Sequence, residues 1–297
     1  MALEGAITIR KETCKKCNLC AEVCPNKIFR KNAENEMSVR EDRAQVCFKC
    51  GQCMAICSTK SVIVNGLSYE GDFFDLTESA SLETAFNDLI TTRRAIRNFK
   101  DKPVPKEMLE KIVKAISFAP PGFPPLKTEV IIVQDREIIK KALPHMIALY
   151  DKLMTMLKNP LIRFFIKKEV GRKKYHSMQN HLIPLLRTRM PELKTGAEDT
   201  ITRNAPAMIL FHYDDNSEDI QSDINIAATY GILAAHAIGL GGSIMEIIPP
   251  AINKSKELRD LLGIPANHSV LSSIIVGYPK FKYKRGIKRS LNSVRWL

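Results

Sequence analysis

The chain has 297 residues, of which 45% are hydrophobic and 26% charged, a composition that predicts an ordinary soluble protein. No run of about 18 apolar residues is present, and the N-terminus lacks a charged segment followed by an apolar one, so we expect neither a spanning helix nor a signal peptide. The length predicts two domains, since domains commonly hold about 100–200 residues. The formal net charge of +13 leaves nucleic-acid binding open at this point.

All eight cysteines lie in one N-terminal stretch. They form two runs of the same spacing, C-x2-C-x2-C-x3-C: Cys14, Cys17, Cys20 and Cys24, then Cys47, Cys50, Cys53 and Cys57. In two-cluster iron–sulfur proteins, three cysteines of such a run bind one 4Fe–4S cluster and the fourth binds the other. The spacing therefore predicts two clusters, one held by Cys14, Cys17, Cys20 and Cys57 and the other by Cys47, Cys50, Cys53 and Cys24.

Zinc and disulfides are the alternatives for these cysteines. Structural zinc usually takes C-x2-4-C pairs separated by a dozen or more residues, and a run of three cysteines at this spacing offers one ion more thiolates than tetrahedral geometry can place from so short a loop. Disulfides require an oxidising compartment, which nothing in the sequence indicates. The stretch closely resembles the bacterial two-cluster ferredoxins, with Ser58 in place of a second proline as its departure.

The resemblance to ferredoxins sets the expected first domain at residues 1–66. Residues 6–10 alternate and lead into the first cysteine run, residues 61–64 form a closing strand, and Asn65-Gly66 forms a turn. We expect an acidic linker over residues 67–80 and a second domain over 81–297. Each 4Fe–4S cluster with its thiolates carries about −2, which lowers the net charge to roughly +9 and weakens the case for nucleic acid.

The remaining positive charge is concentrated in an expected helical region, residues 140–203. Between 152 and 194, eleven lysines and arginines accompany only Glu169 and Glu192. Such a region could lie on an anionic membrane, dock an acidic redox partner, or cover a cofactor site with its charges solvated. We favour the last, because charge runs are usually solvated faces.

An arginine cluster follows a predicted helix at 82–90. Arg93, Arg94 and Arg97 could grip a phosphate, although on this evidence alone a solvated helix end is the better interpretation. The segment resembles the motif R-x-[ST]-x-[RK]-x-[FY] that opens the FMN-dependent nitroreductases. Arg93, Ala95, Arg97 and Phe99 fall on that pattern, with Ala95 in place of the usual hydroxyl residue. The resemblance places Arg97 near the ribityl chain and pyrimidine edge of a flavin.

The next segments follow the same family in order. A predicted helix at 106–118 leads into Ala119-Pro120, which matches the family's flavin-lining loop, and a strand is predicted at 129–133. By this resemblance Pro121 and Gly122 bind the cofactor. Pro124 and Thr128 stand at the family's Asn and Trp positions, so the chemistry of the loop differs.

The second half carries the remaining matches. A buried strand is predicted at 205–213, and an alanine-rich helix at 222–238 corresponds to the helix at the centre of nitroreductase dimers. Gly239-Leu240-Gly241 follows it as in the family, although helix capping alone would explain these glycines. The resemblance assigns flavin binding to Glu246 and FMN phosphate binding to a basic cluster between Gly277-Tyr278-Pro279 and Trp296, namely Arg289 with Lys288 or Arg285.

Other metal and nucleotide motifs are missing from the sequence. The six histidines form no H-x3-H pair and are expected to be structural or surface residues: His145, His176, His181, His212, His236 and His268. No Walker loop is present, and no G-x-G-x-x-G follows a strand.

Together the two resemblances imply a ferredoxin fused to a nitroreductase-like domain of α+β fold, with a central, mostly antiparallel sheet flanked by helices. They imply two 4Fe–4S clusters and FMN, with electrons passing from reduced ferredoxin or NAD(P)H through the clusters to FMN and on to a nitroaromatic, quinone or activated double bond. A relay to a protein partner, and an NAD(P)H-dependent flavoenzyme with the clusters as exit, are the alternatives. We expect a cytoplasmic homodimer and predict no side chain as catalytic acid or base.

Overall fold

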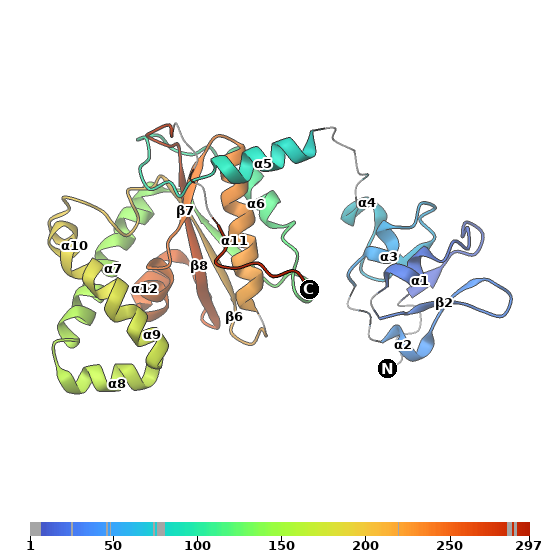
Figure 1. Cartoon of the computed structure of the whole chain (residues 1–297), viewed down its shortest axis with the longest axis horizontal. Helices are drawn as coiled ribbons and strands as arrows, with labels where there is room; N and C mark the ends of the chain where they lie inside the picture. Colours follow the sequence, from blue (N-terminus) through green and yellow to red (C-terminus); the bar gives the residue numbers. More distant parts are fainter. Residues whose placement is uncertain are drawn as a thin grey trace. The chain divides into compact units, whose positions relative to one another are not determined.

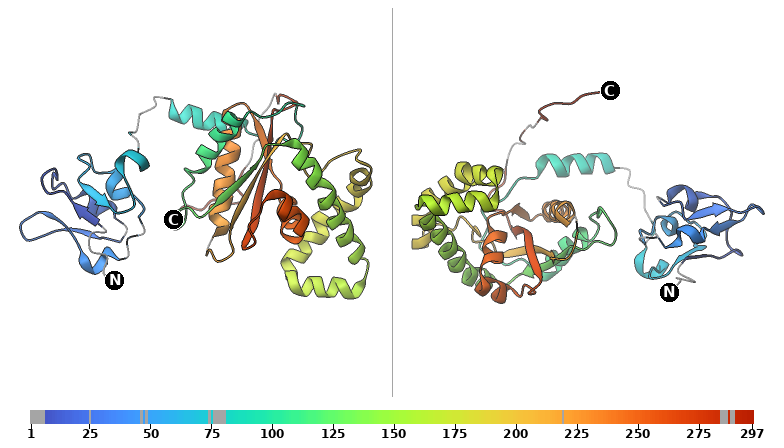
Figure 2. Two further views of the ribbon diagram at one scale, coloured as in Figure 1. Left: turned by 180° about the vertical axis from the view of Figure 1, so that it is seen from behind. Right: turned by 90° about the horizontal axis from the view of Figure 1, so that it is seen from below.

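The computed structural model describes residues 7–24, 26–45, 47, 49–73, 75, 81–218, 220–283, 287 and 290–297, apart from the side chains of Lys174 and His181. The chain divides into two compact units, residues 1–80 with 121–126, and residues 81–120 with 127–297 (Figure 1 and Figure 2). The first unit holds all the cysteines and the second holds the largest sheet.

Two antiparallel strand pairs and several short helices build the first unit. β1 (Ile7–Ile9) pairs with β4 (Val62–Val64), and β2 (Phe29–Lys31) pairs with β3 (Met37–Val39). The helices are α1 (Leu19–Val23), α2 (Glu41–Ala44), α3 (Gln52–Ala55) and α4 (Tyr69–Asp72). Buried cysteines share the core with aliphatic side chains such as Ile28, Met54 and Val62, so the fold turns thiols toward its interior.

The segment expected to form an acidic linker, residues 67–80, begins as part of the first unit. The side chain of Ser68 caps α4 by accepting a hydrogen bond from the Gly71 amide at 2.9 Å. The Tyr69 hydroxyl donates to the Val62 carbonyl at 2.9 Å, and Leu67, Tyr69 and Phe73 pack against the core. Ordered packing therefore continues past residue 66, because the apolar side chains of this segment contact the core.

A four-stranded antiparallel sheet forms the centre of the second unit and confirms the predicted α+β class. Its order is β5-β6-β8-β7. The strands are β5 (Glu129–Val133), β6 (Ala207–Asp214), β8 (His268–Gly277) and β7 (Gly241–Ile244). β6 is buried along most of its length, and its side chains alternate between two cores, with Met208 and Leu210 in one and Ile209 and Phe211 in the other.

Helices cover both faces of this sheet (Figure 1). One core contains residues of α6 (Lys106–Ile116) and α11 (Ile220–Ala237). The other contains residues of α7 (Arg136–Met156), α10 (Ile183–Thr195), α12 (Ile248–Lys254) and α13 (Lys256–Leu262). The small residues of α11 serve this packing: Ala227, Ala228 and Ala235 are fully buried, and a Cβ at Gly231 would meet Ile274 at 3.1 Å and Ile116 at 3.2 Å.

The basic region is helical, as its apolar spacing predicts. Between α7 and α10 lie α8 (Pro160–Val170), α9 (Arg172–Ser177) and a π-helical turn, η1 (Met178–Leu182). Leu161, Phe164 and Phe165 of α8 are exposed, as are Leu82 and Phe86 of the separate helix α5 (Leu82–Thr92). Among the described segments, no helix combines the length and apolarity needed to cross a bilayer.

Candidate functional site

The first cysteine-lined cavity brings together residues from both runs. Cys14, Cys17 and Cys20 line it together with Cys57, the last cysteine of the second run. Burial, together with like-charge repulsion from the neighbouring thiols of Cys14, Cys57 and Cys17, raises the pKa of the Cys20 thiol to about 11. These four sulfurs therefore surround one space, although 43 residues of sequence separate Cys14 from Cys57.

The second cavity has the complementary set. Cys47, Cys50 and Cys53 line it together with Cys24, the last cysteine of the first run. Burial raises the pKa of the Cys53 thiol to about 12, with added repulsion from Cys50, Cys24 and Cys47. Since burial disfavours thiolates here, four of them around one cavity require a cationic core between them, as an iron–sulfur cluster supplies.

The sulfur of the last cysteine in each run accepts a hydrogen bond from a backbone amide. The Ile28 amide donates to Cys24 Sγ at 3.4 Å, and the Ser61 amide donates to Cys57 Sγ at 3.2 Å. Burial alone would raise the pKa of Cys57, but bonding by the Thr59 hydroxyl and by backbone amides outweighs it and lowers that pKa. Such bonds are one of the means by which a protein tunes the potential of a cluster.

The two runs also share an unusual backbone conformation. Positive φ angles occur at equivalent positions: 56° at Lys16 and 55° at Lys49, 70° at Asn18 and 76° at Gly51, and 51° at Lys27 and 52° at Lys60. Left-handed residues turn the chain sharply. Both runs therefore wrap in the same way, and the resemblance between them extends from spacing to conformation.

In the second unit, the end of the sheet at β7 positions the segment 93–99, which carries Arg93, Arg94 and Arg97 and is called the arginine segment. The Ile96 amide donates to the Gly242 carbonyl at 2.9 Å, and Ala95 forms a parallel bridge with Gly242. Phe99 bridges to Pro279, just beyond β8. Residues 95–99 are therefore bonded to the edge of the sheet at both ends, which fixes the backbone that carries Arg97.

The structure separates the roles of the predicted arginines. Arg94 donates to the carbonyls of Thr91 at 2.9 Å and Arg93 at 2.6 Å, so its guanidinium binds the C-terminal end of α5. The predicted role of Arg94 in cofactor binding stays a prediction. Arg97 instead lies close to Arg203, whose pKa is lowered by burial and by the like charge of Arg97.

Arg203 is a candidate that the sequence patterns missed. It follows α10 in a loop held by the buried carboxylate of Asp199, which accepts from the amides of Ile201 at 2.9 Å and of Thr202 and Asn204 at 2.8 Å. Arg203 has φ 58° and a buried Nε that bonds no described residue. Arg203 Nη1 also pairs with Glu198 Oε1 at 3.8 Å, which leaves the Nε group of Arg203, beside the second positive charge of Arg97, as a suitable place for an anionic group.

The other predicted cofactor residues are spread over the chain. Pro121 is partly buried and Gly122 exposed in the loop before β5, and Glu246 follows β7, where partial burial raises the pKa of its carboxyl. The phosphate candidates Arg285, Lys288 and Arg289 lie outside the described residues. Their assignments stay predictions.

Comparison with known proteins gives the two units separate relatives. Residues 90–278 match the nitroreductase family, and residues 7–30 match the 4Fe-4S binding domain. A putative NADH dehydrogenase/NAD(P)H nitroreductase of Archaeoglobus fulgidus is 28% identical over 65% of this chain and 84% of its own length. Iodotyrosine deiodinase 1 of Rattus norvegicus is 24% identical over 65% of this chain and 62% of its own length.

A solved structure shares the fold. The nitroreductase with bound FMN from Bacteroides fragilis superposes with a TM-score of 0.53 at 16% identity, covering 74% of this chain and 99% of its own. The family match spans more than half of the chain, and the 4Fe-4S match covers the first cysteine run. The chain therefore belongs to the nitroreductase family and carries an N-terminal 4Fe–4S domain of ferredoxin type.

Proposed function

We propose that this protein is an iron–sulfur flavoprotein in which two 4Fe–4S clusters and one FMN transfer electrons to a small organic acceptor. One observation carries the proposal: each cysteine-lined cavity takes three cysteines from one run and the last cysteine from the other. This exchange is the arrangement of two-cluster ferredoxins. A zinc site would not require two runs to exchange their fourth ligands.

FMN is the cofactor that the second unit supports best. The Bacteroides fragilis nitroreductase of the same fold has FMN bound. In this chain Arg97 and Arg203 supply positive charge beside the edge of the sheet, and we propose that Arg93 and the basic residues Arg285, Lys288 and Arg289 hold the phosphate. FMN, when bound, accepts electrons singly and delivers two with a proton, which matches one-electron donors to two-electron acceptors.

The protein's own contribution is to bind the cofactors and to orient the acceptor. Two electrons, one from each cluster or in two successive turns, together with two protons from solvent, balance the reduction of a quinone or activated double bond; a nitro group takes further pairs of electrons and protons. We propose reduced ferredoxin as the donor. The name of the Archaeoglobus fulgidus relative favours a second candidate, in which NAD(P)H is the donor and the clusters are the exit.

The chain's assembly and surroundings complete the proposal. We propose a homodimer. We also propose a reducing compartment such as the cytoplasm, because all eight cysteines are free thiols suited to clusters. Domain boundaries near residues 73 and 81 would leave each core intact, because Phe73 packs on the first unit.

Cofactor analysis and rapid kinetics test the proposal. Anaerobically purified protein should hold about eight iron, about eight sulfide and one FMN per chain. Stopped-flow mixing with reduced ferredoxin should bleach the clusters before the flavin, whereas NADH or NADPH would bleach the flavin first if the second candidate holds. Zinc in place of iron, or protein that takes up no FMN, would overturn the proposal itself.

A further inference from the structure

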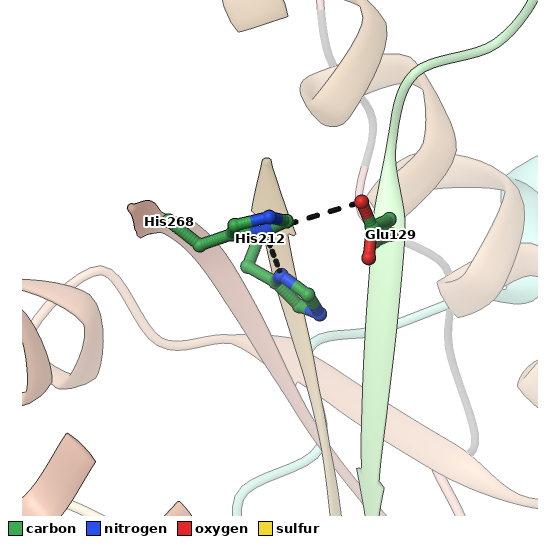
Figure 3. Close-up of side chains that lie close together, drawn as sticks. All are labelled: Glu129, His212 and His268. Atoms are coloured by element: carbon green, nitrogen blue, oxygen red, sulfur yellow. Dashed lines mark hydrogen bonds and ion pairs between the residues drawn. The ribbon is translucent and has the colours of Figure 1, made fainter. Parts of the chain in front are cut away.

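Three side chains from neighbouring strands meet at the end of the sheet opposite the arginine segment. Glu129 begins β5, His212 lies near the end of β6, and His268 begins β8 (Figure 3). Glu129 and His212 are direct partners across β5 and β6, and His268 pairs with Asp214, two residues beyond His212. Residues opposite each other, or offset by two, lie on the same face of a sheet, so the three side chains converge.

The two imidazoles are buried and bonded to each other. His212 is 3% exposed and His268 is 8% exposed, and their Nδ1 atoms are 2.9 Å apart. Two Nδ1–H groups cannot face each other at that distance, so at least one Nδ1 carries no hydrogen and offers a lone pair. Glu129 Oε1 lies 3.9 Å from His268 Nδ1, and the Glu129 side chain is 57% exposed.

We infer that Glu129, His212 and His268 form a binding site for a divalent transition metal ion of the Zn²⁺ type. Neutral imidazole nitrogen and carboxylate oxygen are ligands that suit Zn²⁺, and sites with three protein ligands keep a fourth position for water. The three ligand atoms lie within 4.8 Å of one another.

The distances fit such an ion after small movements. Zn–N bonds of about 2.0–2.1 Å at a tetrahedral angle place two nitrogens about 3.3–3.4 Å apart. The Nδ1 atoms would thus separate by roughly 0.4 Å, and the Glu129 carboxylate would approach His268 by about half an ångström and would also move toward His212. The exposed carboxylate is free to make that movement, whereas the buried rings already lie near their places.

Charge and access favour a cation. Asp214 lies beside His268, and its carboxylate accepts hydrogen bonds from Asn216 and Asn267 at 2.8 Å and 3.1 Å. Glu129 and Asp214 thus bring two carboxylates to the pair of imidazoles. The exposure of Glu129 leaves a solvent-facing side for entry of the ion and for a water ligand.

The site is distinct from the proposed flavin site. β8 spans ten residues, His268 at one end and Gly277 at the other, where the arginine segment lies. At about 3.3 Å per residue the two ends are roughly 30 Å apart. The ion would tie β5, β6 and β8 together at the end of the sheet opposite the proposed flavin site.

Co²⁺ titration of the full-length protein tests the site. The clusters are kept intact under anaerobic conditions, so that the cysteines are occupied. Co²⁺ should bind at one equivalent per chain with visible absorption of a nitrogen- and oxygen-ligated ion, without thiolate charge-transfer bands, and Zn²⁺ should displace it. Glu129→Gln, a change at an exposed position, should weaken binding by about tenfold or more, and His268→Gln should do so as well.

The exposed His145→Ala is the matched control and should bind Co²⁺ like the wild type. Zn²⁺ should raise the melting temperature of the wild type and of His145→Ala, but not that of Glu129→Gln. A wild type that binds no Co²⁺, or a folded Glu129→Gln that binds it with unchanged affinity, would overturn the inference. In that case the two histidines are a hydrogen-bonded structural pair.

Discussion

Replacing Gly241 by alanine should weaken FMN binding and lower the unfolding free energy, while the first unit keeps its iron. A Cβ at Gly241 would lie 2.8 Å from Ile96 Cβ and 3.1 Å from Ile96 Cγ2. Carbon atoms in contact normally lie about 3.5–4.0 Å apart, so Ile96 must retreat by roughly 1 Å. Rotation about χ1 cannot relieve the clash, because Cβ itself is in contact, and the backbone of the arginine segment must therefore move.

The expected magnitudes follow from this displacement. Overpacking of this kind costs about 1–3 kcal/mol of unfolding free energy. A shift of roughly 1 Å in the backbone beside Arg97 also breaks at least one charge-assisted hydrogen bond to the flavin, worth about 1.5–3 kcal/mol, which weakens FMN binding about 10- to 150-fold. The first unit should keep its iron, because the substitution lies outside it.

Gly196→Ala is the control. Gly196 has φ 72° at the C-terminal end of α10, and a Cβ there would meet nothing within 4 Å. Its strain should cost about 1 kcal/mol or slightly more, with FMN affinity unchanged. Urea denaturation of the apoprotein and fluorescence titration with FMN give the two quantities. Normal FMN affinity in a destabilised Gly241→Ala would show that residues 95–99 do not hold the flavin, and unchanged stability would refute the packing argument.

Three further changes test other parts of the proposal. Cys57→Ala should lower the iron content from about eight to about four per chain and abolish the electron paramagnetic resonance signal of one reduced cluster; unchanged iron would contradict the exchange of ligands between runs. Arg203→Gln should weaken FMN binding by about tenfold or more while leaving the unfolding free energy of the apoprotein within about 1 kcal/mol, as titration and denaturation can show. Glu246→Gln should flatten the pH dependence of stability. In the folded wild type the pKa of this carboxyl is raised above 4.5, so the folded state holds the proton more tightly than the unfolded state does. Wild-type stability should therefore fall as pH rises from about 4.5 through the folded pKa. Equal slopes for Glu246→Gln and the wild type over that interval would show that this carboxyl does not contribute.

Local patterns predicted the cysteine cavities because the spacing itself constrains the geometry. A loop that places thiols at i, i+3 and i+6 can surround only a small volume, and the fourth cysteine of each run is directed elsewhere. The helices of the basic region were predictable for a similar reason, since their apolar spacing repeats along the chain.

Contacts between distant segments could not be predicted in this way. Arg203 reaches Arg97 across about a hundred residues, and its left-handed backbone has no sequence signal of the kind that glycine gives. An H-x3-H spacing does not include His212 and His268, because pairing across strands brings together residues 56 positions apart. Most of the small residues of α11 pack on β8 and α6 of the same chain, a contact that the sequence alone did not indicate, and the dimer through this helix stays a prediction.

The tripeptide Gly239-Leu240-Gly241 shows why helix capping and the family resemblance were not competing explanations. Gly239, at φ 80° with open space around it, ends α11 as a capping glycine does, and the Leu240 amide donates to the Ala235 carbonyl at 2.8 Å. Leu240 is then buried, and Gly241 enters β7 where Ile96 leaves no room for a side chain. The same three residues therefore end α11 and begin β7, the strand to which the arginine segment is bonded. The helix cap thus determines where this part of the proposed flavin site begins.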